Sequence, residues 1–199
     1  MTEIRLARTA PGEDPSTAAR RLLTSALETE YGIPASAFQV EKDEKGKPYL
    51  AGYSHIHISI SHSGPYIACA FGERPVGVDV EMWKTHPKWR RIVDKLHSRE
   101  REELLQSCGG VISGDTEEPV REFCGLWVRK ESFLKAIGEG LRVPLDLFDT
   151  TGEWVEQELS PERWRLWQYE PEEGCSLAVC MVGDDGTEPH LQLDLFSGV

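Results

Sequence analysis

The chain has 199 residues and a formal net charge of −12, a length that can bury a substantial core as one domain or as two tightly joined halves. The acidic balance argues against a general nucleic-acid binder, because affinity for phosphate backbones comes largely from Lys and Arg. No apolar run is long enough to cross a membrane and residues 1–14 lack the apolar core of a signal peptide, so we expect a cytoplasmic protein without membrane contact.

The first half of the chain reads as one helix followed by strands. Residues 16–30 have the apolar side typical of a helix, which Gly32 and Pro34 end. A polar stretch, residues 39–46, predicts the end of a strand and a turn. Three strands joined by short Gly- and Pro-containing connections are expected next, at residues 55–61, 66–71 and 76–81. They predict a three-stranded antiparallel meander.

The second half repeats this order of a helix and three strands. Residues 83–106 predict two short helices, the second capped by Ser98, and residues 109–118 read as a loop. A helix of about five turns is predicted from Pro119 to Gly138. Strand-like segments follow at about residues 153–158, 163–170 and 176–182, and near the C-terminus an alternating apolar pattern indicates packing on a sheet edge: Leu191, Leu193, Leu195 and Phe196.

Two carboxylates stand at alternate positions of the strand at residues 76–81. Asp79 and Glu81, in the segment GVDVE, point to one face, and Val78 and Val80 point to the other. Adjacent anions repel each other. The arrangement therefore indicates either a solvated face or a site for a hard cation such as Mg²⁺, which prefers oxygen ligands.

The long helix carries a carboxylate and an ammonium on one stripe. Trp127, Glu131 and Lys135 recur at i, i+4 and i+8, so their side chains project from nearly the same face. Taken alone, the pattern is better explained by an exposed Glu–Lys pair, worth about 0.2–0.5 kcal/mol. We assign Trp127 to packing.

Together with SISHS at residues 59–63, these segments resemble the 4′-phosphopantetheinyl transferases, in particular the larger monomeric type that activates peptide and polyketide synthetases. The family signatures G-[IV]-D-[IV]-E and W-x-x-K-E-[SA]-x-x-K stand here as GVDVE and WVRKESFLK. The likeness extends from about Ser16 to the C-terminus. It implies a Mg²⁺-dependent enzyme of the holo-[acyl-carrier-protein] synthase type. Such an enzyme transfers the phosphopantetheine arm of coenzyme A to a serine of an apo acyl or peptidyl carrier protein and releases adenosine 3′,5′-bisphosphate.

The resemblance also implies an α+β fold. The family has two similar halves, each a helix packed on a three-stranded antiparallel meander, related by a pseudo-twofold axis with the active site between them. Applied to this sequence, residues 1–100 form the N-terminal half, with the nucleotide side, Asp79 and Glu81. Residues 101–199 form the C-terminal half, with Glu131 and Lys135. Because both halves lie in one chain, a monomer is expected.

For the chemistry, the resemblance implies that Asp79, Glu81 and Glu131 hold one Mg²⁺, which withdraws charge from the pyrophosphate. Lys135 would contact the pyrophosphate, and Lys130 would contact it or the carrier. Either Glu131 or a metal-bound water would take the serine proton, and the sequence leaves both open.

Contacts to coenzyme A are implied at a second set of residues. Ser61 and His62 would contact phosphate, and Lys47 with Gly46 and Pro48 would line the nucleotide site. These assignments come from the resemblance alone, since a lysine in a turn is ordinarily solvated.

Recognition of the 3′-phosphate of coenzyme A is expected to depart from the family pattern. Larger members hold this group with basic residues of an N-terminal segment, and this chain begins after most of it. Arg5, Arg20 or Arg21 compensates, or recognition of the 3′-phosphate is weaker. We expect a looser preference between coenzyme A and its 3′-dephospho form.

Positive charge is concentrated between residues 84 and 101, where Lys and Arg far outnumber acidic residues. This stretch would steer an acidic carrier protein toward it. Two other functions remain open. A Mg²⁺-dependent phosphodiesterase acting on coenzyme A would use the same carboxylates but needs no carrier surface. A non-catalytic carrier-binding module would have no need for clustered anions.

Overall fold

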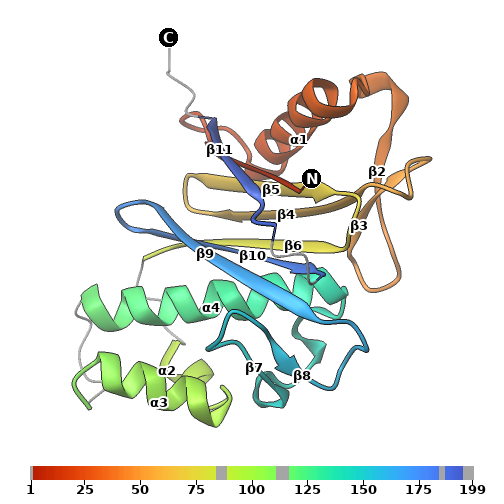
Figure 1. Ribbon diagram of the computed structural model, residues 1–199. Helices are drawn as coiled ribbons and strands as arrows, with labels where there is room; N and C mark the ends of the chain where they lie inside the picture. The colour runs from red at the N-terminus through yellow and green to blue at the C-terminus, as the bar shows by residue number, and fades with distance from the viewer. Residues whose placement is uncertain (1, 84–88, 111–116, 184–186, 195–199) are drawn as a thin grey trace.

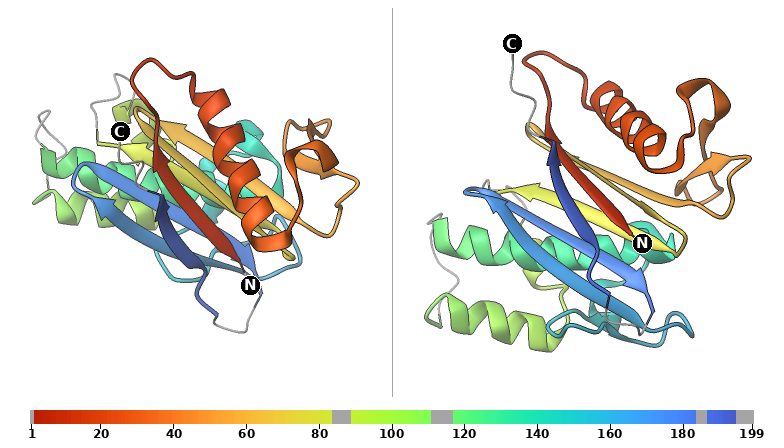
Figure 2. Two further views of the ribbon diagram at one scale, coloured as in Figure 1. Left: turned by 90° about the horizontal axis from the view of Figure 1, so that it is seen from above. Right: turned by 45° about the horizontal axis from the view of Figure 1, so that its top comes forward.

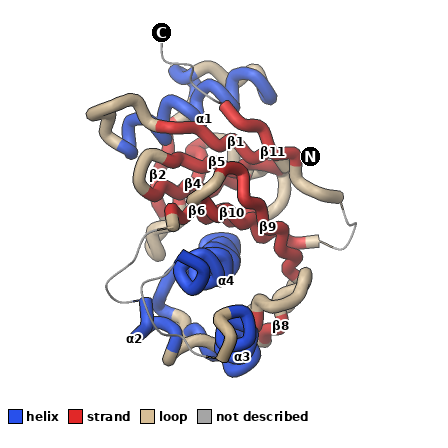
Figure 3. Tube along the Cα trace, turned by 90° about the vertical axis from the view of Figure 1, so that its left-hand side faces the viewer, coloured by secondary structure: helices blue, strands red, loops and turns tan. Residues whose placement is uncertain are grey.

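The computed structural model describes residues 2–83, 89–110, 117–183 and 187–194. Its elements form stacked layers with an α+β composition (Figure 1). Helix α1 (Pro15–Tyr31) covers a six-stranded sheet, a three-stranded sheet lies beneath it, and helix α4 (Glu117–Ile137) covers the far face of the smaller sheet. Helices α2 (Trp89–Val93) and α3 (Ser98–Ser107) lie beyond α4, and Figure 3 shows the same succession from the side.

Helix α1 forms where the sequence predicted it, with signals at both ends. Asp14 is the N-cap and its carboxylate accepts a hydrogen bond from the Thr17 N–H at 2.9 Å. Gly32 ends the helix in the left-handed conformation, with φ 65°. The buried side chains are those of the predicted apolar side, and Figure 2 shows the helix lying over the larger sheet: Ala18, Ala19, Leu22, Leu23, Ala26 and Leu27.

The larger sheet has the strand order β11-β1-β5-β4-β3-β2. In chain order its strands are β1 (Glu3–Arg8), β2 (Gln39–Lys42), β3 (Pro48–Ala51), β4 (His57–Ser63), β5 (Tyr66–Gly72) and β11 (His190–Asp194). Strands β4 and β5 form the predicted hairpin. Strand β11 pairs with β1 at the edge, and Leu191 packs there as predicted, whereas the side chain of Leu193 is 41% exposed. Residues 195–199, with the other two members of that pattern, lie outside the described residues.

The smaller sheet corrects both predicted meanders. Its order is β6-β10-β9, with β6 (Val76–Met82), β9 (Trp164–Glu172) and β10 (Cys175–Val182). Strand β6 does not continue the β4–β5 hairpin, because β5 already pairs with β4 on one side and with β1 on the other. Strand β1 was missed in the sequence. In the second half, residues 153–158 yield only β8 (Glu156–Gln157), which pairs with β7 (Phe148–Asp149) in a separate sheet.

The order of elements nevertheless repeats. In the larger sheet, β1 is followed by α1 and by the hairpin β4–β5, and β5 pairs with β1. In the smaller sheet, β6 is followed by α4 and by the hairpin β9–β10, and β10 pairs with β6. The strand that bears Asp79 and Glu81 thus belongs to the smaller sheet and does not share a sheet with the two strands predicted beside it, at residues 55–61 and 66–71.

Three apolar clusters hold the layers together. The first lies between α1 and the larger sheet and the second between the two sheets, where Val76, Val78 and Val80 of β6 are buried. The third lies under α4, against α2, α3 and β9. Short 3₁₀ helices complete the chain: η1 (Ala35–Ala37), η2 (Gly140–Arg142) and η3 (Leu145–Leu147). Within the described ranges, no helix is long and apolar enough to span a bilayer.

Candidate functional site

Strand β6 and helix α4 approach each other unusually closely, and Gly77 permits it. A Cβ atom at Gly77 would lie 2.0 Å from the Ser132 carbonyl oxygen and 2.4 Å from the Ala136 backbone nitrogen. Since its valines face the larger sheet, β6 turns Gly77, Asp79 and Glu81 the other way. The two motifs that carried the family resemblance therefore face each other.

Asp79 is the centre of the polar contacts between these elements. Its carboxylate is 5% exposed, and Oδ1 accepts hydrogen bonds from the Ser61 hydroxyl at 2.6 Å and from Lys135 Nζ at 2.6 Å. Lys135 Nζ also donates to Ser61 Oγ at 2.9 Å. Asp79 Oδ2 is buried and has no hydrogen-bond partner among the described residues. One carboxylate oxygen is therefore free to take a further ligand.

Serine hydroxyls of β4 line the side of β6 that does not pair with β10. Ser63 Oγ donates to Glu81 Oε1 at 2.9 Å and accepts from the Met82 N–H at 3.1 Å. Ser59 Oγ accepts from the Val78 N–H at 3.0 Å. The alternating serines of SISHS thus satisfy backbone donors of β6 and orient its two carboxylates. The sequence indicated a half-buried strand here but did not reveal this role.

Glu131 joins the two carboxylates of β6 electrostatically. Burial raises its pKa to about 7, and the nearby charge of Asp79 adds to that effect, whereas Lys135 opposes it. Burial also raises the pKa of Glu81, with a further contribution from Asp79. Among the described residues, Lys135 supplies the ammonium that acts on both Glu81 and Glu131. Such an excess of buried negative charge favours a bound cation.

The residues present fit a hard divalent ion by their chemistry. All three candidate ligands, Asp79, Glu81 and Glu131, offer carboxylate oxygens, which Mg²⁺ prefers, and Asp79 Oδ2 lacks a partner in the described part of the chain. These side chains do not form a preassembled metal site. In the described ranges, no group of three His, Cys, Asp or Glu side chains is close enough to hold a metal ion. Lys135 instead occupies Asp79 Oδ1.

The raised pKa of Glu131 predicts a pH-dependent loss of stability. Its pKa in the folded chain, about 7, exceeds the ordinary value of 4.5. The contribution of Glu131 is therefore fully present below about pH 4.5 and is lost as the pH rises through about 7. In urea unfolding without divalent ions, we expect wild type to lose about 1–3 kcal/mol relative to Glu131→Gln between pH 5 and 8.

Added Mg²⁺ provides the control for this measurement. At pH 8 the ion should stabilise wild type more than Glu131→Gln, because the variant lacks one proposed ligand. Parallel stability curves for the two proteins between pH 5 and 8 would contradict the prediction.

A basic cavity of about 600 Å³ lies beside the carboxylates. Its walls come from α1, the β2–β3 hairpin, β4 and the C-terminal end of α4. Among its described lining residues the charged side chains are all cationic, with no Asp or Glu: Arg20, Lys42, Lys45, Lys47 and Lys135. Gly46, Pro48 and His62, which the sequence assigned to coenzyme A, also line it. The cavity therefore suits an anionic ligand.

The β2–β3 hairpin is fastened to the end of α4. Lys47 Nζ donates a hydrogen bond to the Ala136 carbonyl, and burial lowers the pKa of this lysine to about 8. Lys45 pairs with Glu139, which follows the helix. Lysines near a helix C-terminus satisfy its free carbonyls. The hairpin that lines the cavity is thereby held next to Lys135.

Lys130 is the predicted site residue that the structure places elsewhere. Its side chain is fully buried, and Nζ lies 2.7 Å from Glu100 Oε2. The ammonium also donates to the carbonyls of Leu145 and Phe148. It has no exposed surface for a substrate. Trp127, assigned to packing, stacks on Phe123 with ring centroids 6.0 Å apart, which confirms that assignment.

The basic stretch proposed as the carrier surface is described in part. Residues 84–88 lie outside the described ranges, as does most of the predicted loop at residues 109–118. The two predicted helices are present as α2 and α3, but the N-cap of α3 is His97, and the predicted cap, Ser98, is its first helical residue. Arg99 pairs with Asp149 and Glu156, and Arg101 donates to the Asp94 carbonyl.

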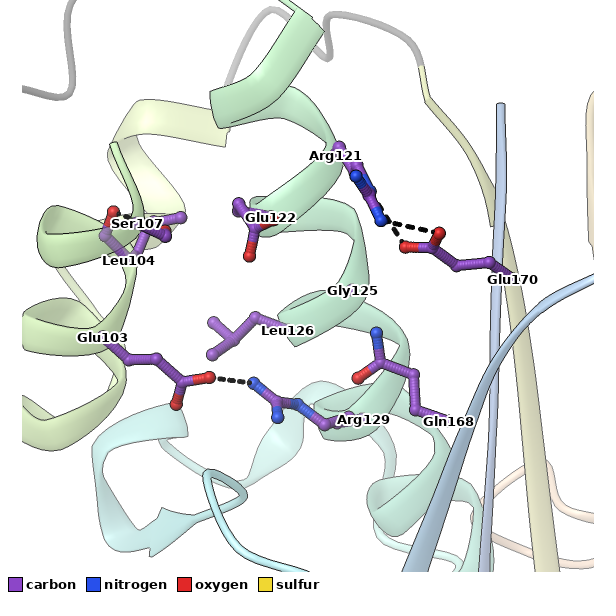
Figure 4. Close-up of a pocket in the computed structure, with 10 residues that line it drawn as sticks. All are labelled: Glu103, Leu104, Ser107, Arg121, Glu122, Gly125, Leu126, Arg129, Gln168 and Glu170. Carbon is purple, nitrogen blue, oxygen red and sulfur yellow. Dashed lines mark hydrogen bonds and ion pairs between the residues drawn. The ribbon is translucent and has the colours of Figure 1, made fainter. Parts of the chain in front are cut away.

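A second hollow lies between α3, α4 and β9 and differs from the basic cavity in its charge (Figure 4). Its volume is about 120 Å³. Arg121 pairs with Glu170 at 2.8 Å, and Arg129 pairs with Glu103 at 3.2 Å. Because its arginines are matched by carboxylates, this hollow has no excess of positive charge to attract an anion.

Comparison with known proteins places this geometry in a family. Residues 75–180 match the model of the 4′-phosphopantetheinyl transferase superfamily. The chain is 33% identical over 173 residues to 4′-phosphopantetheinyl transferase Sfp of Bacillus subtilis (strain 168), covering 84% of this chain and 73% of that protein. It is 29% identical over 177 residues to 4′-phosphopantetheinyl transferase gsp of Aneurinibacillus migulanus, with 82% and 68% coverage.

A third relative is 4′-phosphopantetheinyl transferase HetI of Nostoc sp., 26% identical over 173 residues, with 84% of this chain and 70% of that protein covered. The family match contains both β6, with Asp79 and Glu81, and α4, with Glu131 and Lys135. The chain belongs to the 4′-phosphopantetheinyl transferase superfamily.

Proposed function

We propose that this protein transfers the 4′-phosphopantetheine arm of coenzyme A to a serine of an apo acyl or peptidyl carrier protein, as a monomer. The observation that carries the proposal is the junction of the basic cavity with the carboxylates of Asp79, Glu81 and Glu131. Lys135 belongs to both, since it lines the cavity and binds Asp79. A polyanionic nucleotide in the cavity would thus present its pyrophosphate to the carboxylate cluster.

In this reaction, the carrier serine oxygen attacks the pyrophosphate phosphorus that bears the pantetheine arm. A new P–O bond forms, the bond to the bridging oxygen breaks, and adenosine 3′,5′-bisphosphate leaves with that oxygen. We assign the serine proton to the Glu131 carboxylate, which lies close enough to Asp79 and Lys135 to interact with both charges. Lys135 stabilises negative charge on the pyrophosphate as it is transferred.

Asp79, Glu81 and Glu131 would hold Mg²⁺, which when bound withdraws charge from the pyrophosphate. Ser61 positions Asp79 and Lys135 through its hydroxyl, and His62 lies at the cavity wall. Gly46, Lys47 and Pro48 line the nucleotide side of the same cavity. The repeated order of strand, helix and hairpin supports the pseudo-twofold arrangement implied by the family.

Intact-mass analysis of an apo carrier protein tests this function. The carrier is incubated with the protein, coenzyme A and Mg²⁺, and wild type is expected to add one phosphopantetheine. Glu131→Gln should lower the rate by about 10²–10⁴-fold, as loss of a general base does. Glu122→Gln, on the same helix but lining the second hollow, is the matched control and should react like wild type.

Other outcomes separate the remaining functions. Coenzyme A cleaved without carrier modification would favour a phosphodiesterase. Intact coenzyme A and unmodified carriers of both the fatty-acid and the peptide-synthetase type would favour a non-catalytic carrier-binding module.

A further inference from the structure

A groove of about 880 Å³ lies on the opposite side of the β2–β3 hairpin from the basic cavity. Lys42 of β2 lines the cavity, whereas Tyr49 of β3 lines the groove. Tyr49 pairs with Glu41, the neighbour of Lys42, and neighbouring residues of a strand point to opposite faces. The other wall is the connection from β8 to β9, residues 159–162, and Figure 1 shows this connection and the hairpin at the same end of the stacked layers. The transfer reaction does not use this groove.

Apolar side chains predominate among the described residues that line the groove. Tyr49 and Leu159 lie on its two walls and remain 42% and 38% exposed. Pro48 and Pro161 also line these walls, and the buried ring of Trp164 continues the lining. Pockets of about 300–1,000 Å³ with mostly apolar walls are the usual binding sites of small molecules. Exposed apolar surface that is collected in such a groove indicates a ligand.

The charge of the groove is opposite in sign to that of the basic cavity. Its described lining includes three carboxylates, those of Asp43, Glu139 and Glu162. The Lys47 backbone N–H donates to Asp43 and lowers the pKa of that carboxyl. The Ser160 hydroxyl donates to Glu162 and lowers its pKa in the same way. Both carboxylates therefore stay ionised at neutral pH, and Glu162 forms no ion pair with a described residue.

Positive charge near the groove is already engaged. The Lys47 ammonium donates to a carbonyl at the end of α4, and burial lowers the pKa of this lysine to about 8. Burial also lowers the pKa of His57, so its ring is neutral at pH 7. Lys45 pairs with Glu139 but is not among the described lining residues. Even with both lysines counted, the three carboxylates leave an excess of negative charge, which the exposed Glu162 presents to solvent.

We propose that the groove binds a small amphiphilic amine, which has an aromatic or aliphatic body and a protonated amino group. The body lies between Tyr49 and Leu159, where it buries apolar surface of both walls. The amino group lies at Glu162 and forms a charge-assisted hydrogen bond with its carboxylate. An anion of the same shape is repelled here and attracted to the basic cavity instead.

The hairpin connects the groove with the basic cavity. Lys47 and Pro48 line both. The register joins β3 to β4 at one position, Tyr49 with His57, so the hairpin depends on its contacts with α4 for its place. An amine packed on Tyr49 holds the hairpin in the position that also forms the wall of the cavity. The amine and coenzyme A therefore raise each other's affinity, and this coupling, unlike the groove itself, rests on the proposed function.

Calorimetric titration of two probes into the full chain at neutral pH tests the proposal. The probes are 1-naphthylmethylamine and 1-naphthylacetate, which share an aromatic body and carry opposite charges. The amine should bind in the millimolar range or more tightly, as expected for a fragment of this size, and the acetate at least about 10-fold more weakly. Leu159→Ala and Glu162→Gln should each weaken binding of the amine by about 3–10-fold. Glu158→Gln removes an exposed carboxylate of the same connection that is not among the described lining residues, so this matched control should bind like wild type.

Coenzyme A titrations measure the coupling. With the amine near saturation, wild type should bind coenzyme A about 5-fold more tightly, and Leu159→Ala should lose this gain. An unchanged affinity for coenzyme A would overturn the coupling, while binding of the amine would still support the groove. Failure of coenzyme A to bind, with the amine bound, would overturn the proposed function and leave the amine site standing.

Three results would overturn the amine site. The first is that the two probes bind equally or that neither binds, and the second is an amine affinity that neither Leu159→Ala nor Glu162→Gln changes. The third is self-association of wild type in analytical ultracentrifugation that Leu159→Ala abolishes, which would assign the groove to a second copy of the chain.

Discussion

The Lys130→Met substitution is expected to destabilise the protein by about 3–5 kcal/mol, because it leaves a buried carboxylate without its counter-charge. Lys130 and Glu100 are both fully buried, with Nζ 2.7 Å from Glu100 Oε2. The other Glu100 oxygen accepts hydrogen bonds from the Thr150 N–H at 2.9 Å and from its hydroxyl at 2.7 Å. Equilibrium unfolding in urea measures the loss.

A second variant and a control identify the cause of this loss. Lys130→Met combined with Glu100→Gln should be less destabilised than the sum of the two single variants, because residues of one buried pair couple by about 0.5–3 kcal/mol. Lys45→Met removes an exposed pair with Glu139 and should cost no more than about 1 kcal/mol. A Lys130→Met protein of wild-type stability that no longer transfers phosphopantetheine would restore the role in substrate contact that the sequence suggested.

Lys130 illustrates what a motif can and cannot reveal. Lys130 and Glu131 are adjacent in WVRKESFLK, and successive residues of a helix point in directions about 100° apart. Glu131 lies close enough to Asp79 of β6 for their charges to interact, whereas Lys130 is buried against Glu100 of α3. The partner of Lys130, Glu100, lies 30 residues away in the chain on α3, and no sequence period connects the two. The resemblance supplied the residues of the motif, but only tertiary packing decides which of them meet the ligand.

The strands show the same limit. Alternation predicted β4, β5, β6, β9 and β10 close to their observed positions, and the β4–β5 hairpin follows from the short Gly-containing turn between these strands. The sheet to which β6 belongs could not be predicted, because its valines can pack on any apolar face. Strand β1 excludes β6 from the larger sheet at this position, because β1 already pairs with the free edge of β5. Of Arg5, Arg20 and Arg21, only Arg20 lines the basic cavity, which the sequence could not show because a cavity wall is assembled from distant segments.

The Gly77→Ala substitution is expected to disrupt the site more than the same change at any other glycine that the structure describes. Its Cβ would lie 2.0 Å from the Ser132 carbonyl oxygen, whereas real Cβ contacts essentially never fall below 3.0 Å, so β6 and α4 must separate by about 1 Å. Overpacking of this kind costs about 1–3 kcal/mol. The displacement would also pull Lys135 away from Asp79, and a 1 Å misplacement can lower a rate by about 10²-fold. Urea unfolding and the carrier mass assay measure the two effects.

Gly125→Ala, on the same helix, is the matched control. Its Cβ would lie 2.7 Å from the Gln168 side-chain amide, which is the end of a flexible side chain and can swing into the hollow of Figure 4. Alanine also favours a helix over glycine by about 1 kcal/mol, so this variant should match or exceed wild-type stability and retain its activity. In Gly77→Ala, by contrast, the added methyl group meets the rigid backbone of α4 at Ser132 and Ala136. Equal behaviour of the two variants would show that the approach of β6 to α4 does not position the carboxylates.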